Sequence, residues 1–205
     1  MNRKIATLLH TLTFAALVAA IPAAYAETST MDFKSEPDKS MAAAHESFIK
    51  GDTKKASEQL AKASAWIKTQ SDKVGAGSKE DLKKAGDELD KLGDGIKNGT
   101  VKSGDDMKKT YAKVDLQVSK CWHKTAEETK KTGGDTTAAL KKAGDGLEGA
   151  AKWSGNQLSE GTKASVDAVK KAGKSTANGA KSGADEMDKW FKDIGNGITD
   201  LGHKL

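Results

Sequence analysis

Residues 78–97 read SKEDLKKAGDELDKLGDGIK, and this stretch decides the fold class. Its larger apolar residues recur at intervals of three and four, which places them on one face of an α-helix. They are Leu82, Ala85, Leu89, Leu92 and Ile96. Most of the positions between them are lysine, aspartate or glutamate. The segment therefore predicts an amphipathic helix that buries one stripe against partner helices.

Similar stripes lie on both sides of this segment. They consist of Met41, Ala44 and Phe48; of Ala56, Leu60, Ala63, Ile67 and Val74; and of Met107, Tyr111, Val114, Val118 and Cys121. Breaks fall at 51–52, 75–78 and 98–99, and Ser78 and Asp81 have the spacing of a capping box. No proline follows Pro37. Because short loops join antiparallel neighbours, residues 37–132 are predicted to form an antiparallel helical bundle.

The composition changes from Gly133 onward. More than half of the 21 glycines lie in 133–205, and the larger apolar residues thin out to one every 11 positions. These are Leu147, Leu158, Val169, Ala180 and Phe191. An 11-residue repeat, at about 3.67 residues per turn, keeps a stripe on one side of a nearly straight helix. The fold class is thus predicted to be all-α, with a long Gly/Ala-rich amphipathic helical region at 133–205.

The first 26 residues have the features of a cleaved signal peptide. Arg3 and Lys4 precede an apolar run at 5–20, and Ala24 and Ala26 supply the small residues that signal peptidase reads. Residues 27–36 are then a flexible N-terminus. The expected location is the periplasm or the medium.

Charge argues against a nucleic-acid partner. The only arginine is Arg3, and removing Arg3 and Lys4 lowers the net charge from +5 to +3. Arginine is the usual residue for bidentate phosphate recognition, and the lysines here alternate with acids.

Motifs of catalysis and cofactor binding are missing from the sequence. No glycine-rich phosphate loop is present, and no strand-turn-helix context arranges a catalytic triad. His45, His123 and His203 form no helical pair. The expectation is a protein that is not an enzyme and has no cofactor and no metal site.

Cys121 permits three interpretations. Its place on the Val114 and Val118 stripe favours a buried core residue. An unpaired cysteine in an oxidising compartment could also form a disulfide between two chains, or act as a reactive thiol.

The C-terminal residues form a candidate membrane or partner contact. The apolar positions Met187, Trp190, Phe191, Ile194, Ile198, Leu201 and Leu205 follow heptad spacing opposite charged residues. Such a segment can lie at a lipid interface or dock on a partner. The alternative is that it closes the core of the bundle.

Two segments resemble known families. Lys-Lys-Ala-Gly occurs at 141–144 and again at 170–173 in an 11-residue frame. Residues 143–181 resemble group 3 late embryogenesis abundant proteins and exchangeable apolipoproteins. Residues 43–67 resemble the helical hairpin of the YfdX family of periplasmic stress proteins. Both resemblances imply a role in stress.

The predicted function is stress protection in the cell envelope. Amphipathic helices would act on a membrane surface or on unfolding client proteins. The alternative is a structural scaffold, in which the stripes pack on copies of the same chain as a homo-oligomer.

Overall fold

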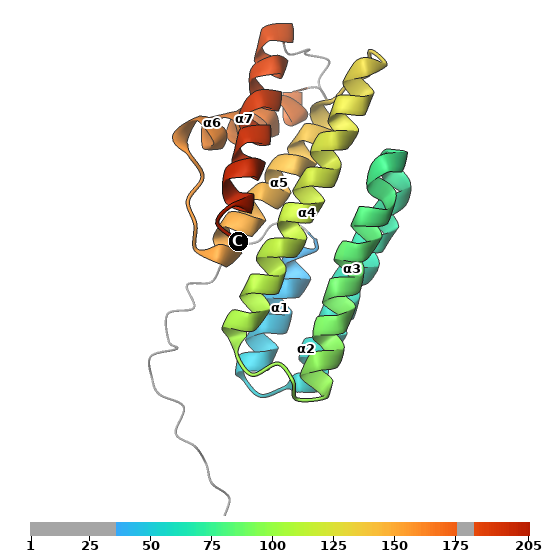
Figure 1. Ribbon diagram of the computed structural model, residues 1–205, viewed down its shortest axis with the longest axis vertical. Helices are drawn as coiled ribbons and strands as arrows, with labels where there is room; N and C mark the ends of the chain where they lie inside the picture. Colours follow the sequence, from blue (N-terminus) through green and yellow to red (C-terminus); the bar gives the residue numbers. More distant parts are fainter. Residues whose placement is uncertain (1–35, 176–182) are drawn as a thin grey trace, which may run out of the picture. The chain divides into compact units, whose positions relative to one another are not determined.

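The computed structural model describes residues 36–175 and 183–205. Regular structure in these residues is entirely helical, so the predicted all-α fold class is confirmed for this part of the chain (Figure 1). The elements are α1 (Asp38–Ile49), α2 (Thr53–Gln70), the short 3-10 helix η2 (Ser71–Lys73), α3 (Ala76–Lys97), α4 (Gly104–Lys131), α5 (Thr137–Ser154), α6 (Glu160–Ser175) and α7 (Ala184–Gly202). The predicted signal peptide at 1–26, residues 27–35 of the predicted flexible N-terminus, and Ala180 of the 11-residue stripe lie outside the described residues.

The predicted breaks at 51–52 and 98–99 are confirmed, whereas the break predicted at 75–78 is shorter because α3 begins at Ala76. Gly51 and Gly99 occupy the turns with φ of +80° and +66°, a left-handed conformation that favours glycine. Asp52 caps α2 by accepting a hydrogen bond from the Lys55 amide at 2.9 Å. Ser103 caps α4 by accepting one from the Asp106 amide at 3.2 Å.

The predicted capping box at Ser78 and Asp81 is wrong. Helix α3 begins at Ala76, with Gly75 in an extended conformation before it. The Gly75 amide donates to the Thr125 hydroxyl of α4 at 3.1 Å, which fixes this earlier start. Ser78 therefore lies inside the first turn and is buried.

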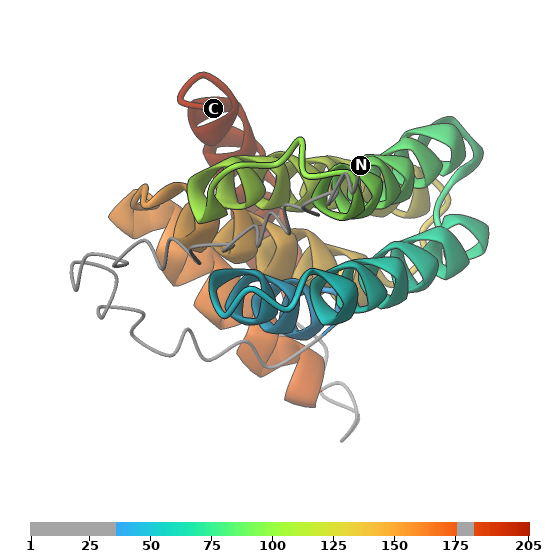
Figure 2. The same ribbon diagram turned by 90° about the horizontal axis from the view of Figure 1, so that it is seen from below.

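Helix α4 is the centre of the fold. It packs against α1, α3, α5 and α7, while α2 packs against α1 and α3, and α6 packs against α5 and α7. The long helices α3, α4 and α7 run along the vertical direction of Figure 1, and Figure 2 shows α5 beside α4. All described helices belong to one compact unit, so the change of composition at Gly133 is not a break in packing.

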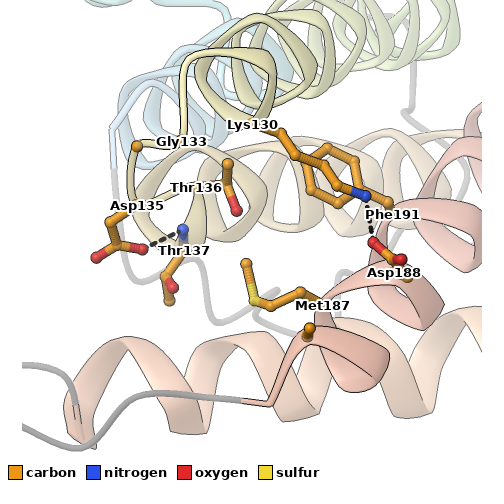
Figure 3. A pocket seen from close by; sticks show the side chains of 10 residues that line it. Lys130, Gly133, Asp135, Thr136, Thr137, Met187, Asp188 and Phe191 are labelled. Carbon is orange, nitrogen blue, oxygen red and sulfur yellow. Dashed lines mark hydrogen bonds and ion pairs between the residues drawn. The ribbon is translucent and has the colours of Figure 1, made fainter.

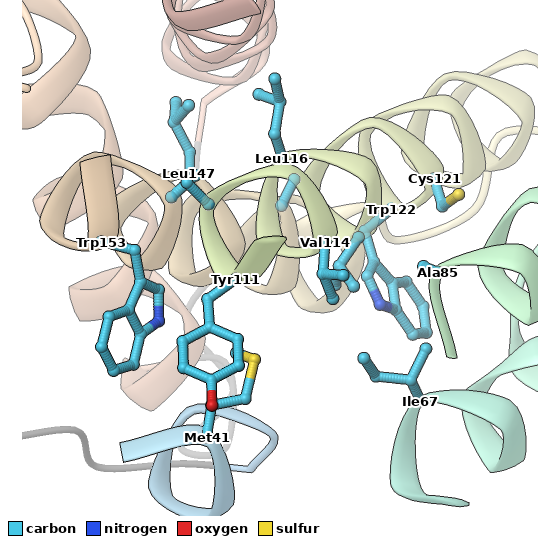
Figure 4. Close-up of a cluster of buried hydrophobic side chains, with 14 of the residues drawn as sticks. Met41, Ile67, Ala85, Tyr111, Val114, Leu116, Cys121, Trp122, Leu147 and Trp153 are labelled. Carbon is cyan, nitrogen blue, oxygen red and sulfur yellow. The ribbon is translucent and has the colours of Figure 1, made fainter. Parts of the chain in front are cut away.

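The apolar stripes predicted for α1 to α4 form the core. Leu60, Ile67, Leu82, Leu89 and Met107 are fully buried, whereas Phe48 and Val74 at the ends of their stripes are partly buried. Figure 4 shows aromatic residues at the junction of α1, α4 and α5. The rings of Tyr111 and Trp153 meet edge to face with centroids 4.7 Å apart.

The C-terminal region is helical, but the single straight helix predicted for the 11-residue stripe is wrong. Helix α5 ends at Ser154, the next residue Gly155 has a φ of +69°, and Leu158 lies in the connection to α6. Leu147 and Val169 are buried on different helices, and Phe191 lies on a third. The stripe is therefore divided among helices that pack on one another.

Glycine lets α5 approach α4 closely. A Cβ atom added at Gly146 would lie 2.9 Å from the carbonyl oxygen of Asp115 and 3.1 Å from the amide nitrogen of Ser119. The Ser119 hydroxyl donates across the same contact to the carbonyl of Ala143 at 2.6 Å. Gly146 thus permits contact between two helix backbones, and this contact partly offsets the low helix propensity of glycine.

Candidate functional site

The apolar residues predicted as a C-terminal contact surface divide into two groups. Trp190, Ile194, Ile198 and Leu201 are buried and close the core over α4, α5 and α6. Met187 and Phe191 are partly buried, and Leu205 is 38% exposed. In this conformation, only the second group is accessible to a membrane or partner.

Met187 and Phe191 line a cavity of about 460 Å³ (Figure 3). Its other wall is the turn between α4 and α5, where Asp135 accepts a hydrogen bond from the Thr137 amide at 2.9 Å. Lys130 lies over the Phe191 ring, with 5.1 Å between Nζ and the ring centroid, and forms an ion pair with Asp188. The cavity thus offers an apolar surface with a charged rim, and a methyl-bearing side chain or an acyl chain end suits it.

Polar contacts attach α7 to its neighbours. The ring nitrogen Nε2 of His123 lies 3.0 Å from the carbonyl oxygen of Phe191. From α6, the Thr162 hydroxyl donates to the Asp193 carbonyl at 3.1 Å, and the Ser165 hydroxyl donates to the Asp193 carboxylate at 2.6 Å. Lys189 and then Ser165 hold the pKa of Asp193 below its ordinary value by hydrogen bonding to the carboxylate.

Gly197 sets how closely α7 approaches. An added Cβ there would lie 2.5 Å from the Thr162 methyl carbon and 2.8 Å from Leu147 Cδ2. Leu147 of α5 and Leu116 of α4 point toward α7 (Figure 4). The docked position of α7 therefore depends on a residue without a side chain.

Cys121 lies in the α3–α4 contact. It is 2% exposed, and its thiol lies 3.6 Å from the Ser78 carbonyl, to which it donates. Burial, and secondarily the Asp81 carboxylate, raise the pKa of the thiol to about 11. Because the thiolate is the nucleophile, this environment favours the core interpretation over a disulfide between chains or thiol chemistry.

A buried acidic pair lies where α1, α4 and α5 meet. Asp115 of α4 is 1% exposed, and Asp38 of α1 is 7% exposed. Trp153 Nε1 donates to Asp38 at 3.3 Å. Burial, and then the neighbouring Asp38 carboxylate, raise the pKa of Asp115 well above its ordinary value. Burial also raises the pKa of Asp38, so both carboxyl groups favour the protonated form and the two titrate as a pair.

The sequence analysis missed this pair. Asp115 follows Tyr111 by four residues and precedes Val118 by three, so the spacing places its carboxyl group on the buried face of α4. A carboxylic acid on an apolar stripe was the signal that could have found it. Asp38, in the first turn of α1, gave no comparable signal.

The histidines lie apart from one another in different helices. His45 is buried in α1, His123 lies on α4, and His203 follows α7 at the surface. Across 36–175 and 183–205, no three His, Cys, Asp or Glu side chains are arranged to hold a metal ion. No helix in the same ranges is both long and apolar enough to cross a membrane.

Comparison of the chain with models of protein families, with curated proteins and with solved structures finds no match.

Proposed function

We propose that this protein is a non-enzymatic, exported protein that protects the cell envelope under stress by exchanging α7 between its own bundle and a membrane surface. The observation that supports this proposal is the construction of α7. Aromatic and aliphatic residues occupy one face and charged residues the other, and the helix is attached at its rim by polar contacts. Such a helix is suited to lie in the plane of a lipid interface.

The contacts at the rim of α7 are weak individually. Lys130 and Asp188 are each about half exposed, and an exposed ion pair contributes about 0–1 kcal/mol. Gly195 and Gly197 inside the helix each disfavour it by about 1 kcal/mol relative to alanine. Docked or membrane-bound, the same apolar face is removed from water, so the exchange replaces one apolar environment with another.

The charges of α7 favour apolar burial over attraction to anionic lipid. Its acids outnumber its lysines: Asp185, Glu186, Asp188, Asp193 and Asp200 against Lys189 and Lys192. We therefore expect phosphatidylcholine vesicles to bind the protein at least as well as phosphatidylglycerol vesicles, with little dependence on salt. Unfolding client proteins, the second proposed partner class, would offer α7 a similar apolar surface.

The alternative of a homo-oligomeric scaffold uses the same apolar stripes. In the described residues, the stripes of α1 to α4 pack on one another within one chain. Light scattering of the protein without residues 1–26 tests this alternative: a monomer supports the exchange of α7, and a stable oligomer supports the scaffold.

The proposal is tested by weakening the docking of α7 without removing its apolar face. Gly197→Ala adds a methyl group that clashes with Thr162 and Leu147, and it also favours the helix. The exposed neighbour Asn196→Ala is the matched control, because it raises helix propensity without a buried clash.

In vesicle co-sedimentation, Gly197→Ala should increase the bound fraction well beyond Asn196→Ala. Hydrogen exchange in α2 and α3, which do not form extensive contacts with α7, should be unchanged in both variants. The proposal fails if neither the wild type nor Gly197→Ala binds vesicles.

A further inference from the structure

A second cavity lies at the opposite end of α7. It has a volume of about 580 Å³ and lies between the N-terminal half of α4, the end of α5 and the last residues of the chain. Five lysines and one acid line it: Lys108, Lys109, Lys113, Lys152, Lys204 and Asp105. We call this cavity the basic pocket.

The ion pairing here differs from that of α3. On α3, Lys83, Lys91 and Lys97 each pair with an acid three residues earlier. In the basic pocket, Lys108 pairs with Asp105 at 3.4 Å, while Lys109, Lys113 and Lys204 have no ion-pair partner within the described part of the chain. Positive charge is therefore concentrated at this place in a protein whose charges otherwise alternate.

The arrangement is unfavourable for the helix that carries it. Lys109 and Lys113 are four residues apart, so their ammonium groups lie on one face of α4. Like charges at this spacing destabilise a helix by about 0.2–0.5 kcal/mol. Asp105, four residues before Lys109, offsets part of this cost, but Lys113 has no acid three or four residues away.

The positive field reaches buried groups beneath the pocket. Burial, and secondarily the Lys108 ammonium, lower the pKa of His45. Burial raises the pKa of Asp38, and the Lys152 ammonium lowers it. The wall below is Trp153, which is 4% exposed, and Asn156 adds an amide to the polar lining. A concave site lined mainly by positive charge, with a low-dielectric wall, concentrates anions.

We propose that the basic pocket binds a phosphate-bearing anion. Lysine ammonium groups act as flexible point charges, and they suit a compact, multiply charged group such as a phosphate monoester better than a planar one. This inference does not require the exchange of α7, because the pocket is assembled in the docked state, in which Lys204 joins the lysines of α4 and α5.

The test measures binding of inorganic phosphate by calorimetry, against chloride at equal ionic strength. Lys109→Gln and Lys113→Gln remove one charge each while keeping a long side chain with good helix propensity. Lys62→Gln, at an exposed position of α2, is the control. Each single substitution should weaken phosphate binding about threefold and the double substitution about tenfold.

Unfolding midpoints of the variants should equal or slightly exceed that of the wild type, because both lysines are at the surface and each substitution relieves their mutual repulsion. Vesicles that contain phosphatidic acid distinguish the source of the anion. Binding to these vesicles is compared with binding to phosphatidylcholine vesicles without phosphatidic acid. If the double variant loses the additional binding that phosphatidic acid causes, the anion is a lipid headgroup, and if the variant keeps it, the anion is a soluble phosphate. The proposal is overturned if the wild type does not bind phosphate above chloride, or if the double variant binds it as well as Lys62→Gln does.

Discussion

Asp115→Asn should stabilise this protein at neutral pH and change how its stability depends on pH. In the native state, the Asp115 carboxyl group is buried beside Asp38, and burial raises its pKa well above the ordinary value. The substituted amide has nearly the same shape, is uncharged at every pH and offers an NH2 donor to Asp38. The substitution therefore removes the ionisation without adding volume.

The direction in which the free energy of unfolding changes with pH follows from proton linkage. Above the ordinary aspartate pKa of 3.8, the unfolded carboxyl group loses its proton, whereas the native one keeps it. The free energy of unfolding of the wild type then falls by about 1.4 kcal/mol per pH unit until the raised native pKa is passed. Over two such units, the variant gains about 2.7 kcal/mol relative to the wild type.

The assay is urea unfolding at pH 5, 6, 7 and 8, with the exposed Asp94→Asn as control. The lowered pKa of His45 acts in the opposite sense, because it costs stability as the pH falls, and it is common to all three proteins. The difference between variant and wild type should grow with pH until the raised native pKa of Asp115 is passed. A constant difference, or a destabilised variant at pH 7, would refute the reasoning.

Two further predictions concern packing. Gly146→Ala should destabilise the protein by about 1–3 kcal/mol, because its methyl group meets the α4 backbone. Gly161→Ala, with open space around it, should be neutral or stabilise by up to about 1 kcal/mol. Chemical unfolding compares the two, and equal effects would contradict close backbone contact. Cys121 should react with a maleimide only as fast as the protein opens, because its thiol is buried. Rapid labelling of the native protein, or a disulfide-linked dimer on a non-reducing gel, would contradict the core interpretation.

The helical stripes and the turns between α1 and α4 could be predicted from the sequence because each depends on neighbouring residues. The stripe of Leu82, Leu89 and Ile96 is a local pattern, and Gly51 and Gly99 mark turns through their own conformation. The start of α3 could not be predicted in this way, because Thr125 of α4 fixes it from fifty residues away.

The role of the C-terminal glycines depends on tertiary contacts. A Gly/Ala-rich segment predicts weak helices when each is considered alone, but Gly146 and Gly197 lie where another helix leaves no room for a side chain. The basic pocket was not predicted for a related reason. Lys109, Lys152 and Lys204 are far apart in a sequence whose charges alternate, and only the packing of three segments brings them together.

The exchange of α7 is tested most directly by locking it to α4. Lys130 and Asp188 form an ion pair between the two helices, so cysteines at these positions (Lys130→Cys with Asp188→Cys) can be joined by a short bis-maleimide. The measurement is phosphatidylcholine vesicle binding of the joined protein against the same protein blocked with N-ethylmaleimide. The account predicts that the joined protein loses binding and the blocked protein keeps it. Equal binding by both would show that α7 need not leave the bundle, and would contradict the account.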